Sequence, residues 1–278
     1  WSSDVCSSDL DKKKEEITAT VSTDKVISYR GEKSGEIIFS SEEAIKDDEK
    51  KDSDININEN DNKQNQLNYY ASNRTLDKNK PMVALTFDDG PDPKRTSEII
   101  EILKKYNARA TFFDIGNLME KYPETLKEEV ESGCDVGGHT YSHVNLNELS
   151  KAEIHEEISK MEDVFRNVTG QELKYVRPTY GNANTLVQET VKHPLINWCV
   201  DSNDWKLRDT DKILEEIYQT QDFDGKIIIM HVIYDATVEA VKKLVPELIQ
   251  KGYQLVTISE MAEYKGYTLQ EGKIYYQF

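Results

Sequence analysis

The sequence predicts an α/β protein built on a parallel β-sheet, and a barrel or partial barrel fits it better than an open sheet. Two observations support this prediction. Seven short apolar runs alternate with amphipathic helical patterns from residue 81 onward. The unusual polar clusters of the chain follow the ends of these runs, where parallel barrels place their active-site residues. The predicted strands are 82–87, 110–115, 135–138, 174–177, 196–200, 226–230 and 254–258.

Three helices between these strands can be placed from the sequence. Apolar residues at helical spacing indicate one helix around 99–106 and a second over 154–165. Ser150 and Glu153 form a capping-box pair that starts the second helix. A third helix is expected over 237–251, with a glycine directly after it as a stop signal.

Composition divides the chain into four parts. Residues 1–10 are expected to be non-native, because they resemble translated adaptor sequence. Residues 11–80 are too polar to bury a core, so we expect a largely disordered stalk with at most a small strand pair near 17–38. Residues 81–262 form the main folded domain, and 263–278 an extension that packs on it.

Charge and cysteine content exclude several classes of function. The formal net charge of −17, from 52 acidic and 35 basic residues, argues against nucleic acid or an anionic membrane as the main partner. Three cysteines are too few for a disulfide framework or a thiolate metal site, and no protein partner is indicated. No stretch is apolar enough to span a membrane. The chain does not begin with Met, so we expect that an export signal or membrane anchor preceded it.

Two adjacent carboxylates, Asp88 and Asp89, end the first predicted strand just before Gly90 and Pro91. Charges at the mouth of an apolar strand are costly unless a metal, a water or a cation uses them. The alternative is an Asp-Gly turn with solvated acids.

The third strand is followed by His139 and His143, four residues apart. Such a pair is often incidental, but with a carboxylate from another strand end it can form a two-histidine, one-carboxylate metal site. Asp88 and Asp89 compete for the third position.

Further polar residues follow the later strands. Arg177 can clamp a carboxylate with its planar fork, and its alternative is a surface ion pair. Asp204 and Trp205 place an acid and a large aromatic ring at the rim. His231 ends a β-branched run, and is either a hydrogen-bonded core residue or a general acid oriented by Asp204.

Five segments, in this order, resemble the motifs of the polysaccharide deacetylases, the NodB-homology group or carbohydrate esterase family 4. They are 86–91, 139–143, 177–181, 201–205 and 229–231. The resemblance covers about 81–261 and is specific, because all five occur in sequence. It implies a distorted, TIM-like (β/α)7 barrel and a hydrolase that removes acetyl groups from glycans.

The resemblance also implies a metal centre and a base. Asp89, His139 and His143 would hold one divalent ion, with Zn favoured and Co, Ni, Mn or Fe acceptable to the same ligands. Asp88 would be the general base that activates a water at the metal, and Arg177 would hold it ionised.

The remaining motif positions would bind and protonate the substrate. His231 would protonate the leaving amine, oriented by Asp204. The backbone N–H of Tyr180 would help to stabilise the oxyanion, and Trp205 and Ile229 would line the pocket for the acetyl methyl group.

Three residues depart from the usual motifs: Thr179 stands in place of Pro, Val232 in place of Asp, and Cys134 in place of His. None removes a residue with an implied catalytic role. Val232 removes a possible acid near His231, which could shift the pKa of that imidazole or reduce activity.

By analogy, the substrate is a glycan polymer, and we expect N-acetylglucosamine of peptidoglycan or a chitooligosaccharide-like chain. An O-acetyl esterase acting on xylan or another polysaccharide is the first alternative, and an inactive glycan-binding module of the same fold is the second. The protein is expected to be extracellular or associated with the cell envelope.

Overall fold

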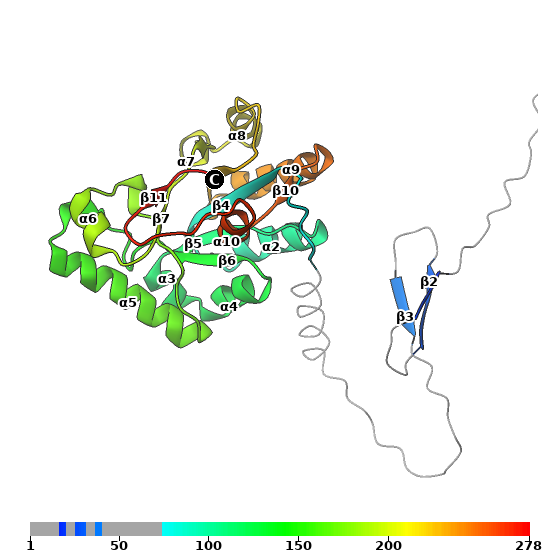
Figure 1. Cartoon of the computed structure of the whole chain (residues 1–278), viewed down its shortest axis with the longest axis horizontal. Coiled ribbons are helices and arrows are strands. Elements are labelled where there is room, and N and C mark those ends of the chain that lie inside the picture. The colour runs from blue at the N-terminus through cyan, green and yellow to red at the C-terminus, as the bar shows by residue number, and fades with distance from the viewer. Residues whose placement is uncertain (1–16, 21–25, 32–36, 41–73) are drawn as a thin grey trace, which may run out of the picture. The chain divides into compact units, whose positions relative to one another are not determined.

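The computed structural model describes residues 17–20, 26–31, 37–40 and 74–278, which fall into two compact units, Trp1–Asn56 and Ile57–Phe278 (Figure 1). The first unit contains strands β1 (Ile17–Thr20), β2 (Val26–Gly31) and β3 (Ile37–Ser40). They form an antiparallel sheet in the order β1-β2-β3, so three strands occur where at most a pair was expected. The rest of the predicted stalk up to residue 73, and residues 1–10, lie outside the described residues.

The second unit is built on a parallel sheet, which confirms the predicted fold class. Its strands run in the order β6-β5-β4-β9-β8, and β10 pairs with the start of β4. The bounds are β4 Met82–Gly90, β5 Thr111–Asp114, β6 Asp135–Gly138, β8 Val200–Asp201, β9 Lys226–His231 and β10 Gln254–Leu255.

The strand predicted at 174–177 is wrong. Only Val176 joins the sheet there, through parallel bridges to Gly138 and Leu195. Pro178 and Pro194 stand on either side of this contact, and proline cannot donate to a ladder. The sheet is therefore joined to the segment at Leu195 through this one residue.

The strand predicted at 196–200 is instead two short strands, β7 (Leu195–Ile196) and β8. The segment changes partners between them. β7 pairs with β11 (Ile274–Tyr275), near the C-terminus, whereas β8 pairs with β9. An antiparallel bridge from Gln277 to Lys226 then connects the C-terminal segment back to β9, so the strands form an irregular ring.

Among the described residues 74–278, nine α-helices lie between or after the strands. They are α2 Arg95–Lys105, α3 Gly116–Lys121, α4 Pro123–Glu131, α5 Lys151–Thr169, α6 Thr185–Thr190, α7 Asp204–Leu207, α8 Thr210–Ile217, α9 Asp235–Gln250 and α10 Ile258–Tyr264. Short 3-10 helices occupy Leu146–Glu148 and Thr179–Gly181. The three predicted helices are confirmed, and both halves of the Ser150–Glu153 capping box are formed.

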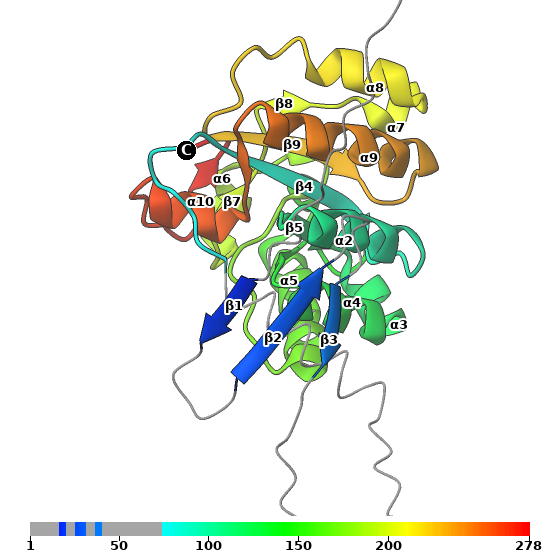
Figure 2. The same cartoon turned by 90° about the vertical axis from the view of Figure 1, so that its right-hand side faces the viewer.

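The central strand β4 separates two apolar clusters by simple alternation. Val83, Leu85 and Phe87 lie on the outer face of the sheet. They pack in the apolar cluster beneath α2, α8 and α9, which lie along one side of the sheet (Figure 2). Met82 and Ala84 belong to a separate cluster inside the ring. Because side chains alternate along a strand, Thr86 and Asp88 continue this inner row. The strand thus carries Asp88 into the ring of strands.

Among the described residues, no helix combines the length and apolar character needed to cross a bilayer.

Candidate active site

The two carboxylates at the end of β4 are aimed differently because the strand bulges between them. In the pairing with β5, Asp88 stands opposite Phe113 and Gly90 opposite Asp114, so Asp89 is an extra residue. Its φ of 69° lies in the left-handed region, which is unusual for a residue other than glycine. A bulge of this kind re-aims a side chain. It frees Asp89 from the strict alternation that directs Asp88 into the barrel.

Asp89 meets the two histidines of the loop after β6. Its Oδ1 lies 3.2 Å from His143 Nε2 and 3.7 Å from His139 Nε2. The loop turns through positive φ values at Thr140 (62°) and His143 (58°), which brings both imidazoles to one side. Strained backbone of this kind concentrates at functional sites. Asp89, His139 and His143 are also a group whose ligand atoms all lie within 4.8 Å of one another.

This trio fits a metal ion on two further observations. His139 Nδ1 lies 2.8 Å from the carbonyl oxygen of Arg177, so that nitrogen donates and Nε2 keeps its lone pair for a cation. Asp89 Oδ1 is buried and, within the described part of the chain, accepts no hydrogen bond of good geometry, although His143 Nε2 lies 3.2 Å away. A buried acceptor facing two imidazole nitrogens is the donor set that a borderline metal such as Zn takes.

The titration behaviour of the trio suits ligation. Burial alone would raise the pKa of Asp89, but its interaction with His143 and the charges of the imidazoles outweigh burial and hold that pKa below its usual value. Burial lowers the pKa of His139, which favours the neutral imidazole. The interaction with Asp89 raises the pKa of His143. The carboxylate is therefore ionised and the more buried imidazole neutral, as ligands must be.

Arg177 holds Asp88 from inside the barrel. Its Nη1 donates to Asp88 Oδ1 at 2.6 Å and to Thr86 Oγ1 at 2.8 Å. Its other nitrogens donate to the carbonyl oxygens of Ile196 and Asn197, and its guanidinium stacks 4.0 Å from the ring centroid of Phe113. Since Arg177 is fully buried, the alternative of a surface ion pair is wrong. Burial lowers the pKa of the guanidinium, and the charge of Asp88 opposes that shift.

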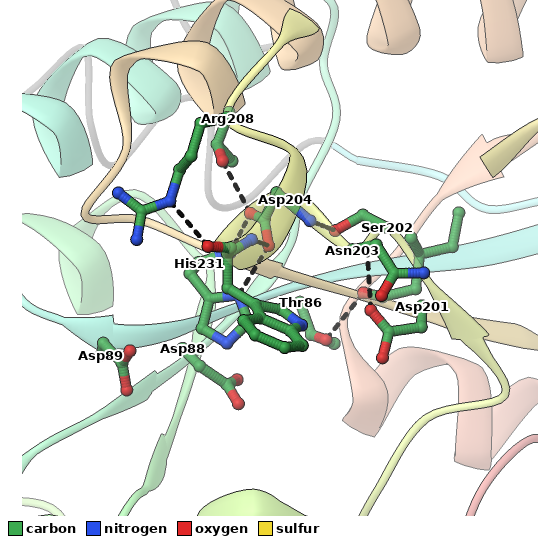
Figure 3. Close-up of polar contacts among 12 residues, drawn as sticks. Thr86, Asp88, Asp89, Asp201, Ser202, Asn203, Asp204, Arg208 and His231 are labelled. Atoms are coloured by element: carbon green, nitrogen blue, oxygen red, sulfur yellow. Dashed lines mark hydrogen bonds and ion pairs between the residues drawn. The ribbon is translucent and has the colours of Figure 1, made fainter. Parts of the chain in front are cut away.

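On the other side of Asp88, His231 is bound to Asp204 (Figure 3). His231 Nδ1 lies 2.7 Å from Asp204 Oδ1, and the His231 backbone N–H donates to Asp204 Oδ2 at 2.6 Å. Thr237 Oγ1 also donates to Oδ2 at 2.6 Å, and the Trp205 N–H to Oδ1 at 2.8 Å. Asp204 is completely buried, and four donors satisfy it.

This environment favours the charged imidazole. Burial opposes protonation of His231, but the hydrogen bond to Asp204, the charge of Asp204 and the charges of Asp88 and Asp89 outweigh it and raise the pKa to about 9. Because Nδ1 is engaged by Asp204, the proton available for transfer is on Nε2.

The three expected substrate-contacting residues lie around this centre. Tyr180 has a φ of 60°, is 62% exposed, and its ring meets His143 edge-on at 5.3 Å between centroids. Trp205 is 50% exposed at the start of α7. Ile229 is buried on β9, paired in register with Thr86. Two large exposed rings at the opening suit contact with a sugar polymer.

Val232 does not contact the imidazole of His231, so an acid at this position would not lie beside that ring. Its side chain is buried in the outer apolar cluster. Alternation along the strand therefore directs it away from the imidazole.

Sequence reasoning missed Thr237 and a second pair of acids. Thr237 lies within the helix predicted at 237–251, and no local pattern marks it as a partner of Asp204. Asp114 and Glu129 are completely buried close to the site, and none of their four carboxyl oxygens accepts a hydrogen bond from the residues that the structure describes. Burial raises the pKa of Asp114 to about 7 and that of Glu129 well above its usual value. A shared proton is the bond these two carboxyl groups can make.

The fold and the site together define an α/β barrel of the hydrolase type, with a histidine–carboxylate metal site at the ends of its strands. A family model described as "Polysaccharide deacetylase" matches residues 75–195. The peptidoglycan-N-acetylmuramic acid deacetylase PdaC of Bacillus subtilis (strain 168) is 39% identical over 191 residues, covering 69% of this chain and 41% of that protein. A peptidoglycan-N-acetylglucosamine deacetylase of Bacillus cereus is 37% identical over 190 residues, covering 66% of this chain and 69% of that protein.

Solved structures agree. A structure described as "T48 deacetylase with substrate" has a TM-score of 0.68 and 34% identity, covering 72% of this chain and 100% of that one. A family 4 acetyl xylan esterase from Clostridium thermocellum, in complex with a cobalt ion, has a TM-score of 0.67 and 27% identity, covering 70% and 98%. The chain belongs to the polysaccharide deacetylase family. It spans about two fifths of the length of the B. subtilis relative.

Proposed function

We propose that this protein is a metal-dependent deacetylase of peptidoglycan that hydrolyses the acetamido group of an amino sugar. The observation that carries the proposal is the convergence of three units: the Asp89–His139–His143 trio, the Asp88–Arg177 pair and the His231–Asp204 pair. Amide hydrolysis needs an activated nucleophile, charge stabilisation at the carbonyl oxygen and a proton for a poor leaving group. The three units can supply these separately.

The trio would hold one divalent ion, with Zn favoured and Co, Ni, Mn or Fe also compatible with its ligands. When bound, the ion would supply Lewis-acid activation of the acetyl carbonyl and of a water molecule.

Asp88 is proposed as the general base. Its Oδ1 is taken by Arg177, and its Oδ2 lies 3.7 Å from His139 Nε2, toward the trio. The guanidinium binds Oδ1 and leaves Oδ2 available to accept a proton from water. A base and a ligand on adjacent residues can act separately because the bulge turns Asp89 away from the direction of Asp88.

His231 is proposed as the general acid. Asp204 holds Nδ1, and a pKa raised to about 9 keeps the imidazole protonated at neutral pH. The proton on Nε2 can then be donated to the departing amine. In this proposal Tyr180 contributes its backbone N–H to the oxyanion, while Trp205 and Ile229 line the acetyl pocket, as the motif positions imply.

The substrate proposal follows the relatives. Those compared here are named as deacetylases of N-acetylmuramic acid and of N-acetylglucosamine in peptidoglycan. Both sugars carry the acetamido group that this site would hydrolyse. Such a substrate would place the protein outside the cell or at the cell envelope, with glycan polymer as its partner.

A second candidate function is an O-acetyl esterase acting on xylan. One observation favours it: a structural neighbour with a TM-score of 0.67 is named as an acetyl xylan esterase. The same base, ion and acid could cleave an ester, whose alkoxide leaving group needs less help from His231.

Acetate release tests both candidates. Purified protein is incubated with peptidoglycan, chitopentaose and acetylxylan, before and after chelation and re-addition of Zn or Co. We expect release from the amino-sugar substrates, loss on chelation, recovery with metal, and no metal recovery in Asp89→Ala. The control Asp211→Asn removes an exposed acid of α8 and should behave as wild type. Release from acetylxylan alone would favour the esterase, and release that survives chelation would exclude the metal mechanism.

A further inference from the structure

Arg208 lies at the rim of the site and is held there by two contacts. It directly follows α7, with a φ of 52°, and its Nε donates to the carbonyl oxygen of Trp205 at 2.7 Å (Figure 3). Its guanidinium carbon lies 3.6 Å from the ring centroid of Tyr234. That ring is 6.1 Å from the imidazole of His231, the proposed general acid. Arg208 is therefore separated from the reaction centre by one aromatic ring.

The charge of Arg208 is not matched by an acid in the described part of the chain. Among the residues that the structure describes, no carboxylate lies within ion-pair distance of this guanidinium, although the chain has a net charge of −17. The two other arginines near the site differ. Arg177 is paired with Asp88, and Arg95 is paired with both Asp92 and Asp235. Arg208 is exposed, and the contacts above engage its Nε and one face.

An arginine fixed in this way is suited to bind a carboxylate. Its planar fork can donate two parallel hydrogen bonds to the two oxygens of a carboxylate. The Trp205 carbonyl and the Tyr234 ring already restrict its rotamers, so less side-chain entropy is lost on binding. Neutral acetamido sugars carry no carboxylate that could accept this pair of hydrogen bonds and match the charge.

We propose that Arg208 binds a carboxylate carried by the glycan beside the acetamido group that is hydrolysed. The inference rests on the proposed deacetylase function and refines its substrate to an anionic amino-sugar polymer. In peptidoglycan, two groups have this chemistry: the lactyl carboxylate of muramic acid and the carboxylates of the stem peptide. The preferred sugar would then be muramic acid or a neighbour of it, in preference to a sugar of a wholly neutral chain.

The alternative is a purely structural role, in which Arg208 only braces Tyr234 and the end of α7. Matched substrates separate the two roles. Three are used: chitopentaose, peptidoglycan strands stripped of peptides so that lactyl carboxylates are free, and strands with intact stem peptides. The variants are Arg208→Gln, Arg208→Lys and the control Lys206→Gln, which removes an exposed cation from the same short helix.

The readout is the ratio of kcat/KM for each anionic strand to that for chitopentaose. We expect Arg208→Gln to lower this ratio about tenfold, Arg208→Lys to lower it less, and Lys206→Gln to leave it unchanged. A fall confined to the peptide-free strands identifies the lactyl carboxylate, and a fall confined to the intact strands identifies the peptide. Equal losses on neutral and anionic substrates, or no loss, would overturn the proposal.

Calorimetry keeps this test independent of turnover. Wild-type and Arg208→Gln proteins are titrated with the peptide-free strands and with chitopentaose. Weaker binding of the anionic strand alone, with chitopentaose binding unaltered, supports the carboxylate contact even if no acetate is released. Equal affinity of both proteins for the anionic strand contradicts it. A wild-type protein that binds these glycans but releases no acetate would refute the proposed function and not the contact.

Discussion

Two groups of buried acids lie close together in this protein and differ in how they are satisfied. Asp88 and Asp204 each accept hydrogen bonds through their side chains. Arg177 donates to Asp88, and His231, Thr237 and backbone N–H groups donate to Asp204.

Asp114 and Glu129 are equally buried but receive no hydrogen bond from the described residues. Burial raises the pKa of Asp114 to about 7, whereas the hydrogen bond and charge of Asp204 raise the pKa of His231 to about 9. The comparison teaches that equally buried acids differ in the donors that the fold provides, and that burial without a donor raises the pKa of an acid.

The largest expected effect comes from removing the cation of a satisfied pair. Arg177→Met leaves Asp88 buried without a partner and should lower the free energy of unfolding by about 3–5 kcal/mol and abolish acetate release. Urea unfolding and the acetate assay measure the two effects. The control Arg166→Met breaks exposed ion pairs to Asp163 and Glu172, which solvent screens, and should leave stability nearly unchanged. Similar effects in both variants would mean that burial of the Arg177 pair is unimportant.

A change of opposite sign is expected at the unsatisfied pair. Since the folded-state pKa values are raised, the folded protein binds protons more tightly than the unfolded chain. The contribution of Asp114 to stability is therefore full below about pH 4, falls as pH rises toward about 7, and stays low above it. Glu129, whose pKa is also raised, adds a fall of its own in the same direction.

Glu129→Gln should remove much of this fall and stabilise the protein at pH 8 by about 2 kcal/mol. Thermal unfolding at pH 5 and pH 8 measures the difference, with Glu131→Gln as an exposed control on the same helix. Destabilisation at pH 8 would show that a cation or donor satisfies the pair in solution.

Asp204→Asn tests the acid that raises the pKa of His231. Without the carboxylate, the pKa of His231 should fall from about 9, and the alkaline limb of the kcat/KM profile should move to lower pH. A raised histidine pKa contributes stability that is fully present below about pH 6.5 and is lost as pH rises through about 9. The free energy of unfolding of the variant should therefore fall furthest below that of the wild type at low pH.

We expect a loss of about a hundredfold in kcat/KM at pH 7 for Asp204→Asn. The control Asp201→Asn changes an acid three residues earlier, at the end of β8, whose Oδ1 accepts a hydrogen bond from the Asn203 N–H. An unmoved alkaline limb in Asp204→Asn would separate Asp204 from the titration of His231.

The smallest effect is expected at Thr237, which gives one of the four hydrogen bonds to Asp204. Thr237→Val keeps the shape of the side chain but removes the donor, and should cost about 1 kcal/mol of stability and lower kcat/KM about fivefold. Thr237→Ser should restore both. If the serine variant is no better than the valine variant, packing of the methyl group and not the hydrogen bond is what Thr237 contributes.

Much of the fold could be predicted because its signals are local. The apolar run of β4, the capping box of α5 and the spacing along α9 each lie within a short window, and the structure contains all three. The predicted strand at 174–177 failed because prolines outside the window removed hydrogen-bond donors. The single strand predicted at 196–200 is wrong because its two parts, β7 and β8, pair with β11 and β9, and no local window of sequence contains these partners.

For the site, the sequence by itself determined which residue types follow which strands, and that order carried the family resemblance. Residue types and spacing left Asp88 and Asp89 as equal candidates for the metal, because adjacent residues of a strand differ only in direction, and the family resemblance assigned the place to Asp89.

The tertiary structure directs their side chains differently, through the bulge at Asp89 and through Arg177, which lies 89 residues from Asp88 in the sequence and binds it on the inner side of the barrel. It alone brought Thr237 to Asp204, Asp114 to Glu129 and Arg208 to Tyr234. Such contacts depend on where strands end and how helices pack against them, and a one-dimensional pattern does not contain that information.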